Sequence, residues 1–410
     1  MIYGLRDFLR RHRRKFLITG VVVSGTFIAL KYAQRKIMEL QERQGREFLE
    51  KLRRLQHFES TERICNQLII SMSAELGQAI IKDCSTDDLL QQLRDNPPNK
   101  LDLWEEMKFV AFTRLTVFIY ATSMLVVALR IQLNVLGGYA YRVTASDGEK
   151  INIDEVQKEQ YLLLLRNFLQ DGGGLAELIR LIRNKVVTLM RQMSLTKRLS
   201  LADMEQLFWS LQMAINSESS KDPCSKMCRY LFPSKLPEHG YNNGDNNSLL
   251  QQMFNETLDL LESDDAATVC SNNVCRGFSL AVDAIAESMA ESIHLAQKST
   301  IPSSKGDDDC ILSNPSISTD LKASTTSIEN KNSTLTSSVT SNDSLLNINS
   351  VQIALAKLIP IVSGLTSKGF DSNSRPQNLP TSLTTFYVVA EKCKTLGANV
   401  YETFSTSPAA

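Results

Sequence analysis

The feature that most constrains this chain is an uncharged apolar run near its N-terminus, FLITGVVVSGTFIAL (Phe16–Leu30). A helix over this run would be apolar all round, whereas a helix of a soluble bundle is apolar along one stripe. A membrane-spanning helix needs about 20 apolar residues, and Lys15 and Lys31 can lengthen the span by extending their ammonium groups outward. The run therefore predicts a transmembrane anchor over residues 16–36.

A strongly basic leader, residues 1–15, precedes the anchor as in a signal sequence. Lys31, Arg35 and Lys36 follow the apolar run where a cleavable signal would have small residues, so we predict an uncleaved signal anchor. By charge alone, the denser N-terminal cluster would lie in the cytosol. The predicted membrane and targeting residues are Arg10, Arg11, Arg13, Arg14, Lys15, Phe16 and Leu30.

Residues 37–56 predict a charged connecting helix that continues the anchor. Its acids precede bases at i, i+4 spacing, which is the favourable order on a helix; the pairs are Glu39–Arg43, Glu42–Arg46, Glu47–Lys51 and Glu50–Arg54. About 25 residues at about 1.5 Å each would hold the next domain on the order of 40 Å from the bilayer. A charged surface helix of a bundle is the alternative interpretation.

The rest of the chain has recurrent apolar periods near 3.6 residues, which indicates an all-α fold. We predict a helical domain in two parts, residues 57–299 and 350–410, separated by a disordered Ser/Thr-rich insert at 300–349 that has too few apolar residues to fold. A loop is expected over 218–247, and a last helix from Leu383 to Phe404. A second uncharged run, Leu115–Leu129, favours a central core helix over a second membrane span, with Gly137–Gly138 as its C-terminal cap.

A candidate binding element follows Pro97–Pro98, which make a corner between two helices. In NKLDLWEEMKF (Asn99–Phe109), Leu101, Trp104 and Lys108 share one face of the predicted helix. A tryptophan just past a corner, near the end of a bundle, can fill the core or anchor a partner. From the residues alone, burial in the core is the favoured interpretation.

Composition excludes several function classes. The chain has 45 basic and 45 acidic residues, so it lacks the basic excess of a nucleic-acid-binding protein. Nucleotide-binding loops and hydrolase, kinase and metalloprotease motifs are absent. The spacings of the eight cysteines do not match common zinc sites. We therefore expect a non-enzymatic protein with no cofactor, no metal, no nucleic-acid partner and no small-molecule substrate.

Several segments resemble the peroxin-3 family of peroxisomal biogenesis factors. They run in order along nearly the whole chain: LKYAQRKI (30–37), HFESTERICN (57–66), the segment 99–109, FTRLTVFIYATSMLVVALRIQLNVLGGY (112–139), RGFS (276–279), LAKLIPIVSG (355–364) and ANVYETFST (398–406).

The resemblance implies a single elongated helical bundle in the cytosol, anchored in the peroxisomal membrane. It places the N-terminus in the matrix, opposite to the estimate from charge. It also implies docking of peroxin-19, the soluble receptor for membrane-protein cargo, whose amphipathic helix would lie in an apolar groove at the end of the bundle away from the bilayer. Residues matching that groove are Trp104, Leu93 and Lys100, with Met107 and Ala140 as neighbours. Membrane lipids and, indirectly, the cargo are the other implied partners.

Two alternative functions remain open from the sequence. A basic leader and a short anchor would also suit a tether or import component of another organelle, such as the mitochondrial outer membrane. A membrane-bound helical enzyme would need a buried polar cluster, for which the sequence offers no clear candidate. The location of a tagged chain and its binding to a peroxin-19 helix would separate the first alternative from docking.

Overall fold

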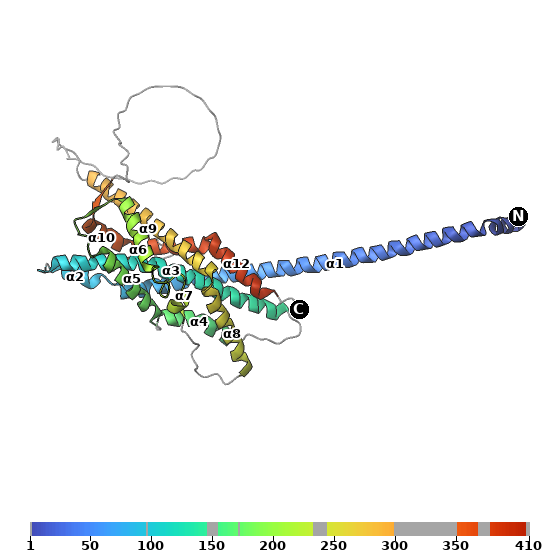
Figure 1. The fold of residues 1–410 in the computed structure, drawn as a ribbon, viewed down its shortest axis with the longest axis horizontal. Coiled ribbons are helices and arrows are strands. Elements are labelled where there is room, and N and C mark those ends of the chain that lie inside the picture. Colours follow the sequence, from blue (N-terminus) through green and yellow to red (C-terminus); the bar gives the residue numbers. More distant parts are fainter. Residues whose placement is uncertain are drawn as a thin grey trace, which may run out of the picture.

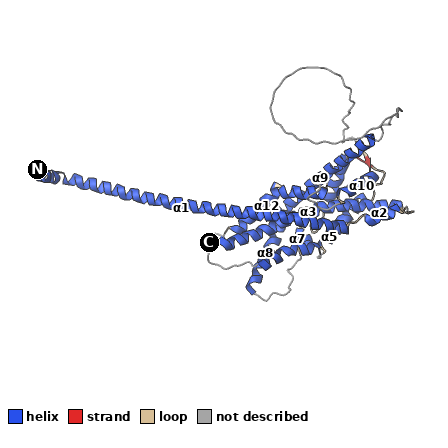
Figure 2. Ribbon diagram, turned by 180° about the vertical axis from the view of Figure 1, so that it is seen from behind, coloured by secondary structure: helices blue, strands red, loops and turns tan. Residues whose placement is uncertain are grey.

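The computed structural model of the chain describes residues 2–95, 97–145, 155–170, 173–232, 244–298, 351–367 and 378–406. The predicted insert at 300–349 lies outside these residues. Within them the fold is an elongated bundle of helices with one long helix projecting from it (Figure 1). The all-α prediction is confirmed, with one small exception: β1 (Arg198–Leu199) and β2 (Ile353–Ala354) form a short antiparallel ladder (Figure 2).

The projecting helix is α1 (Ile2–Asp83), which runs for 82 residues without a break. Every side chain from residue 24 to residue 53 is exposed, so this part forms a bare rod about 45 Å long at about 1.5 Å per residue. The predicted anchor and the predicted connecting helix thus lie on one unbroken helix. Two of the four predicted ion pairs form, Glu42–Arg46 and Glu50–Arg54, whereas Glu39 pairs with Lys36.

Deletion of residues 1–36 is expected to give a soluble, folded protein. The deletion removes the apolar run, and the retained rod from residue 37 to residue 53 is already exposed to solvent. Fractionation and circular dichroism of the deleted chain would test this. A helical fragment that stayed in the membrane after alkaline extraction would show that a second segment enters the bilayer.

The centre of the bundle is α3 (Lys100–Ala145), a helix of 46 residues. Every side chain from Val110 to Tyr139 is buried, because helices pack around α3 on all sides. The prediction that Leu115–Leu129 is a core helix is therefore confirmed. This explains why α3 also has the length and apolar composition of a membrane span, since a helix covered on all sides by apolar neighbours needs no polar face.

The remaining helices surround α3 or cap its ends. They are α2 (Asp87–Arg94), α4 (Glu155–Gln170), α5 (Gly174–Met190), α6 (Leu201–Ile215), α7 (Met227–Leu231), α8 (Gly244–Leu261), α9 (Asp264–Lys298), α10 (Leu355–Leu365), α11 (Leu379–Val389) and α12 (Glu391–Ser405).

Two predicted boundaries are wrong. The expected loop over 218–247 contains α7 and the first turn of α8; α7 forms because Met227, Tyr230 and Leu231 are buried against the bundle. The expected last helix is two helices, α11 and α12, separated at Ala390, whose extended ψ of 124° breaks the helical path.

The predicted cap at Gly137–Gly138 is also wrong, because α3 continues through both glycines to Ala145. These glycines allow close packing instead. A Cβ at Gly137 would lie 2.8 Å from the methyl group of Thr61 in α1, and a Cβ at Gly138 would lie 2.6 Å from the Cβ of Phe404 in α12. The glycine pair therefore lets two helices approach the α3 backbone.

Substitution Gly138→Ala is expected to destabilise the bundle by about 1–3 kcal/mol, the usual cost of overpacking. The atoms it would meet belong partly to the backbone of Phe404, which a change of rotamer cannot move. Chemical denaturation measures the effect. Gly45→Ala is the matched control, since a Cβ there meets nothing within 4 Å and alanine favours the helix by up to about 1 kcal/mol. Equal stability of the two variants would contradict the close-packing interpretation.

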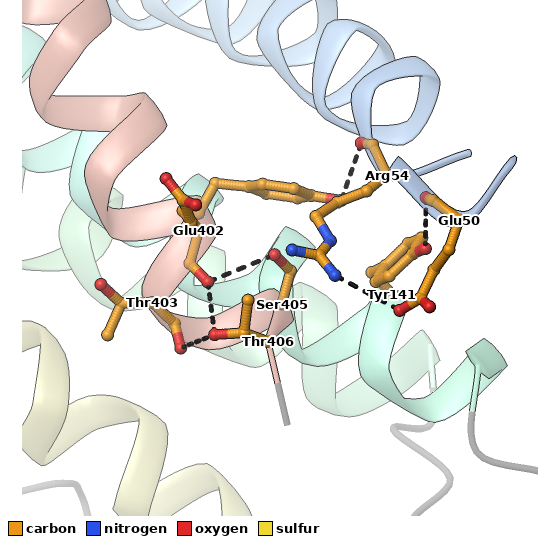
Figure 3. A network of polar contacts seen from close by, with 8 residues as sticks. Glu50, Arg54, Tyr141, Glu402, Thr403, Ser405 and Thr406 are labelled. Atoms are coloured by element: carbon orange, nitrogen blue, oxygen red, sulfur yellow. Dashed lines mark hydrogen bonds and ion pairs between the residues drawn. The ribbon is translucent and has the colours of Figure 1, made fainter. Parts of the chain in front are cut away.

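Tyr141, Tyr401 and His57 hold α1 where it joins the bundle (Figure 3), and we call this set of contacts the collar. Tyr141 of α3 donates a hydrogen bond of 3.3 Å to the carbonyl of Glu50, and Tyr401 of α12 donates one of 3.4 Å to the carbonyl of Arg54. The Nδ1 atom of His57 lies 2.9 Å from the Tyr401 hydroxyl. His57 is therefore structural, and the collar links the rod to the two helices beside it.

Candidate functional site

The site that the sequence singled out lies at the end of the bundle farthest from the N-terminus. Pro97 and Pro98 separate the end of α2 at Arg94 from the start of α3 at Lys100. Figure 1 shows α2 at one extremity of the molecule and the N-terminal end of α1 at the other. Because α1 carries the apolar run, this corner points away from any membrane in which the run is embedded.

The apolar face of α2 is incompletely covered. This helix carries three leucines on one side, yet none of its residues is buried. Leu89 and Leu93 are half-buried, and Leu90 is 43% exposed. Leu101, in the first turn of α3, is 68% exposed. An apolar helix face that the fold leaves partly uncovered is a candidate site for another molecule to pack on.

Trp104 lines a cavity of about 280 Å³ beside this face, here called the Trp104 cavity. The tryptophan is half-buried, so part of its ring packs on the core and part faces the opening. Apolar side chains from four helices surround the cavity: Ile81 of α1, Leu90 of α2, Met107 of α3, and Ile359 and Pro360 of α10.

Arg114 forms the polar wall of the Trp104 cavity and holds its helices together. Its guanidinium donates to the carbonyl of Ser363 at 2.7 Å and to the hydroxyl of Thr366 at 3.0 Å. It also reaches the carbonyl of Cys84 at 3.5 Å. Burial lowers the pKa of Arg114, and the nearby Cys84 and Asp87 oppose that shift. The cavity is therefore built on a fixed network that joins α3, α10 and the end of α1.

Lys108 has a structural role in the core, although it was predicted to share a helix face with Trp104. Its side chain is fully buried, and Nζ donates to the carbonyls of Met190 at 3.1 Å and Met193 at 2.9 Å. It also pairs with Glu105 at 2.5 Å. These carbonyls lie at the C-terminal end of α5, where a cation is favourable. Lys108 thus ties α5 to α3 and does not extend the Trp104 surface.

The structure brings four of the five predicted partner-binding residues to one end of the bundle. Trp104 and Met107 line the cavity, Leu93 is half-buried on α2, and Lys100 is exposed at the start of α3. Ala140 lies 36 residues beyond Trp104 on the same helix, which places it about 54 Å away. The prediction that Ala140 neighbours Trp104 is wrong, because α3 does not turn at Gly138.

Sequence reasoning missed two kinds of residue in this site. The apolar spacing within α2 indicates that Leu90 lies on the apolar face of this helix, but it does not indicate that Leu90 is exposed. Ile359 and Pro360 lie more than 250 residues after Trp104 in the chain, and no local pattern indicates that α10 packs beside α3. The ladder between β1 and β2, at the start of α10, helps to fix that placement.

The predicted membrane and targeting residues all lie on α1. Of these, Leu30 has a described side chain, and it is 62% exposed; the other six precede the described side chains. By length and composition, two helices among the described residues could cross a membrane, one within residues 24–94, near the N-terminus of the chain, and α3. The apolar part of α3 is wholly buried within the bundle. The anchor over residues 16–36 stays a prediction, since residues 16–23 have no described side chains.

These features define a class: a helical bundle carried on a long helix with an apolar N-terminal segment, and with an apolar cavity at the opposite end. Comparison with known proteins identifies the family. The Peroxin-3 family model matches residues 7–99, 95–170 and 168–363. The chain belongs to the peroxin-3 family, a family of peroxisome biogenesis factors.

Relatives from animals match over nearly their full length. Peroxisomal biogenesis factor 3 of Mus musculus is 32% identical over 418 residues, covering 99% of this chain and 98% of the mouse protein. The Homo sapiens protein of the same name is 32% identical over 420 residues, with the same coverage. The peroxisomal membrane protein PEX3 of Komagataella phaffii is 26% identical over 201 residues, covering 39% of this chain and 44% of the yeast protein.

Proposed function

We propose that this protein is a docking receptor of the peroxisomal membrane, and that it binds peroxin-19 through the Trp104 cavity and the apolar face of α2. In this role it promotes the insertion of peroxisomal membrane proteins and the biogenesis of peroxisomes. The observation that carries the proposal is the incompletely covered face of α2 beside a half-buried tryptophan. Membership of the peroxin-3 family supports it independently.

The geometry suits an amphipathic helix. Such a helix inserts its apolar side chains into a groove at i, i+3 or i+4 and i+7 spacing, with polar groups at the rim. Leu93 and Leu101 offer apolar contacts outside the cavity, Leu90 lines it, and Trp104 offers the aromatic anchor that is typical of binding hot spots. Lys100, exposed at the start of α3, supplies a positive charge at the rim.

The proposed orientation places the bundle in the cytosol and the N-terminus on the matrix side. A large folded bundle that stays in the cytosol needs no translocation, and the basic leader can act as the targeting signal. The bare rod then holds the docking site away from the membrane. A cargo-loaded receptor could therefore reach the Trp104 cavity without steric contact with the bilayer.

A binding titration tests the proposal directly. The fragment 41–410 is mixed with a labelled N-terminal helix of peroxin-19, and binding is followed by anisotropy and by tryptophan emission. We expect saturable binding that shifts the emission of Trp104, with Trp209→Phe as the variant that leaves one fluorophore. A folded fragment that does not bind would overturn the proposal and favour a tether with another partner.

A further inference from the structure

A second groove lies on a different face of the bundle, between α6 and α9, which pack side by side (Figure 1). It encloses about 390 Å³, and we call it the α6–α9 groove. The residues that matter for its properties are Glu205, Phe208, Trp209, Cys275, Phe278 and Asp283. None of them lines the Trp104 cavity, so this groove is a separate site.

The floor of the groove is aromatic and rigid. Phe208 of α6 and Phe278 of α9 are buried and stacked, with ring centroids 5.3 Å apart. From below, Phe112 and Tyr120 of α3 contact these two rings at 6.2 Å and 6.3 Å. The Nε2 atom of Gln212 lies 3.1 Å from the sulfur of Cys275 and links the two walls. The groove is thus preformed.

Trp209 forms an apolar edge that the fold leaves uncovered. It is 58% exposed, and Met213, one turn further along α6, is 46% exposed. Tryptophan is the side chain most typical of binding hot spots, where its large ring becomes buried on association. The exposed Trp209, which lines the groove beside its aromatic floor, therefore supplies the anchor position of a docking site, with Met213 exposed one turn away on the same helix.

The charged residues of the groove are both acidic. Glu205 lies on the α6 side and Asp283 on the α9 side, both exposed. Glu287, one turn beyond Asp283 on α9, is also exposed. Arg276 is the basic residue nearest in sequence to Asp283. Its guanidinium lies 5.3 Å from the centre of the Phe386 ring, and it does not line the groove. The groove therefore favours a basic partner and repels an anionic membrane surface.

The two helices that form the groove also favour a helical partner over an extended one. Their backbone groups are already paired, so the groove offers no free edge to an extended strand. A helical partner satisfies its own backbone hydrogen bonds. The lined part of α9, from Cys275 to Asp283, is about 12 Å long, which accommodates about two turns. We propose that the α6–α9 groove docks an amphipathic helix of a partner protein, with apolar residues on Trp209 and basic residues facing Glu205 and Asp283.

The test uses the full-length protein in a neutral maltoside detergent, with Trp104→Phe so that Trp209 is the single tryptophan. The probe is an 18-residue helical peptide with leucines on one face and lysines on the other. We expect a saturable blue shift of Trp209 emission, because the ring passes from water into an apolar contact. The same peptide with glutamates in place of the lysines should leave the emission unchanged.

Variants then assign the interaction to the groove. With an anisotropy readout, Trp209→Ala should weaken peptide binding at least tenfold, and Glu205→Gln with Asp283→Asn should weaken it about three- to tenfold. The effect of the charges should decrease as salt rises. Trp104→Ala should leave this affinity unchanged, so the result does not depend on the peroxin-19 proposal.

Cys275 provides a steric control. It is exposed, whereas the other cysteines that the structure describes are buried or partly buried. In a Cys310→Ser background, a bulky maleimide on Cys275 should block the peptide. Equal affinity of Trp209→Ala and the parent protein, or equal binding of the lysine and glutamate peptides, would overturn the proposal. A blue shift produced by anionic phosphatidylserine vesicles in place of the peptide would also overturn it, in favour of a membrane contact.

Discussion

Substitution of Trp104 by alanine is expected to weaken binding of the peroxin-19 helix by about 2 kcal/mol or more, which is about 30-fold in Kd. The ring lines the Trp104 cavity together with Met107 and Leu90, so its removal leaves the centre of the proposed interface empty. A titration of fragment 41–410 and its Trp104→Ala variant with the labelled helix measures the change.

The control must separate a binding effect from loss of the fold. Trp104 is half-buried, so its truncation should cost less stability than Phe112→Ala, which removes a fully buried ring from the same helix. Truncation of a buried phenylalanine costs about 3–5 kcal/mol. If Trp104→Ala lowers the melting temperature as much as Phe112→Ala does, Trp104 belongs to the core. Trp209→Ala, which changes the other tryptophan, should bind the peroxin-19 helix normally.

Substitution of Arg130 by alanine is expected to destabilise the bundle by about 3–5 kcal/mol, the usual cost of removing one partner of a buried ion pair. Arg130 is fully buried in α3 and pairs with Glu62 of α1. It also donates to the side-chain oxygen of Asn66 at 2.7 Å and to the carbonyl of Val388 in α11 at 2.8 Å. Its loss leaves three acceptors without this donor at the junction of three helices.

Urea denaturation measures this effect, with Arg183→Ala as the matched control. Arg183 pairs with Glu106 at the surface, where both side chains are exposed, and such pairs contribute at most about 1 kcal/mol. In the Arg130→Ala background, Glu62→Gln should recover part of the loss, because it removes the unpaired buried charge. A loss for Arg130→Ala as small as that for Arg183→Ala would show that the network contributes little to stability.

Local patterns predicted the parts of the fold that depend on neighbouring residues. The capping box at Ser200 agrees with its Ser-x-x-Asp spacing, and the Asp203 amide donates a hydrogen bond of 3.2 Å to the Ser200 hydroxyl. The corner at Pro97–Pro98 and the break before α5 at Gly173, with φ of 77°, also follow from residue type. The prediction that Gly137–Gly138 end a helix was wrong, because glycine also allows close packing of helices.

Of the candidate site, the sequence predicted Trp104 but not the residues that surround it. Trp104 could be placed on a helix near a corner, but the cavity that it lines is completed by Ile359 and Pro360, which lie more than 250 residues later in the chain. Lys108 was predicted to share a face with Trp104, but its ammonium group is buried in the core, where it donates to the carbonyls of Met190, at the end of α5, and Met193, just after it. Trp209 attracted no prediction, since its exposure arises from the packing of α6 on α9.

By itself, the sequence determined the all-helical class, the apolar N-terminal segment, the continuity of the charged helix and the resemblance to peroxin-3. These properties depend on residue type and on spacings within a few turns. The tertiary structure decided which apolar faces are covered, which charges are buried and which residues share a site. Burial depends on side chains that lie hundreds of residues apart in the chain. Trp104 and Pro360 are an example, because they line one cavity only once the helices have packed.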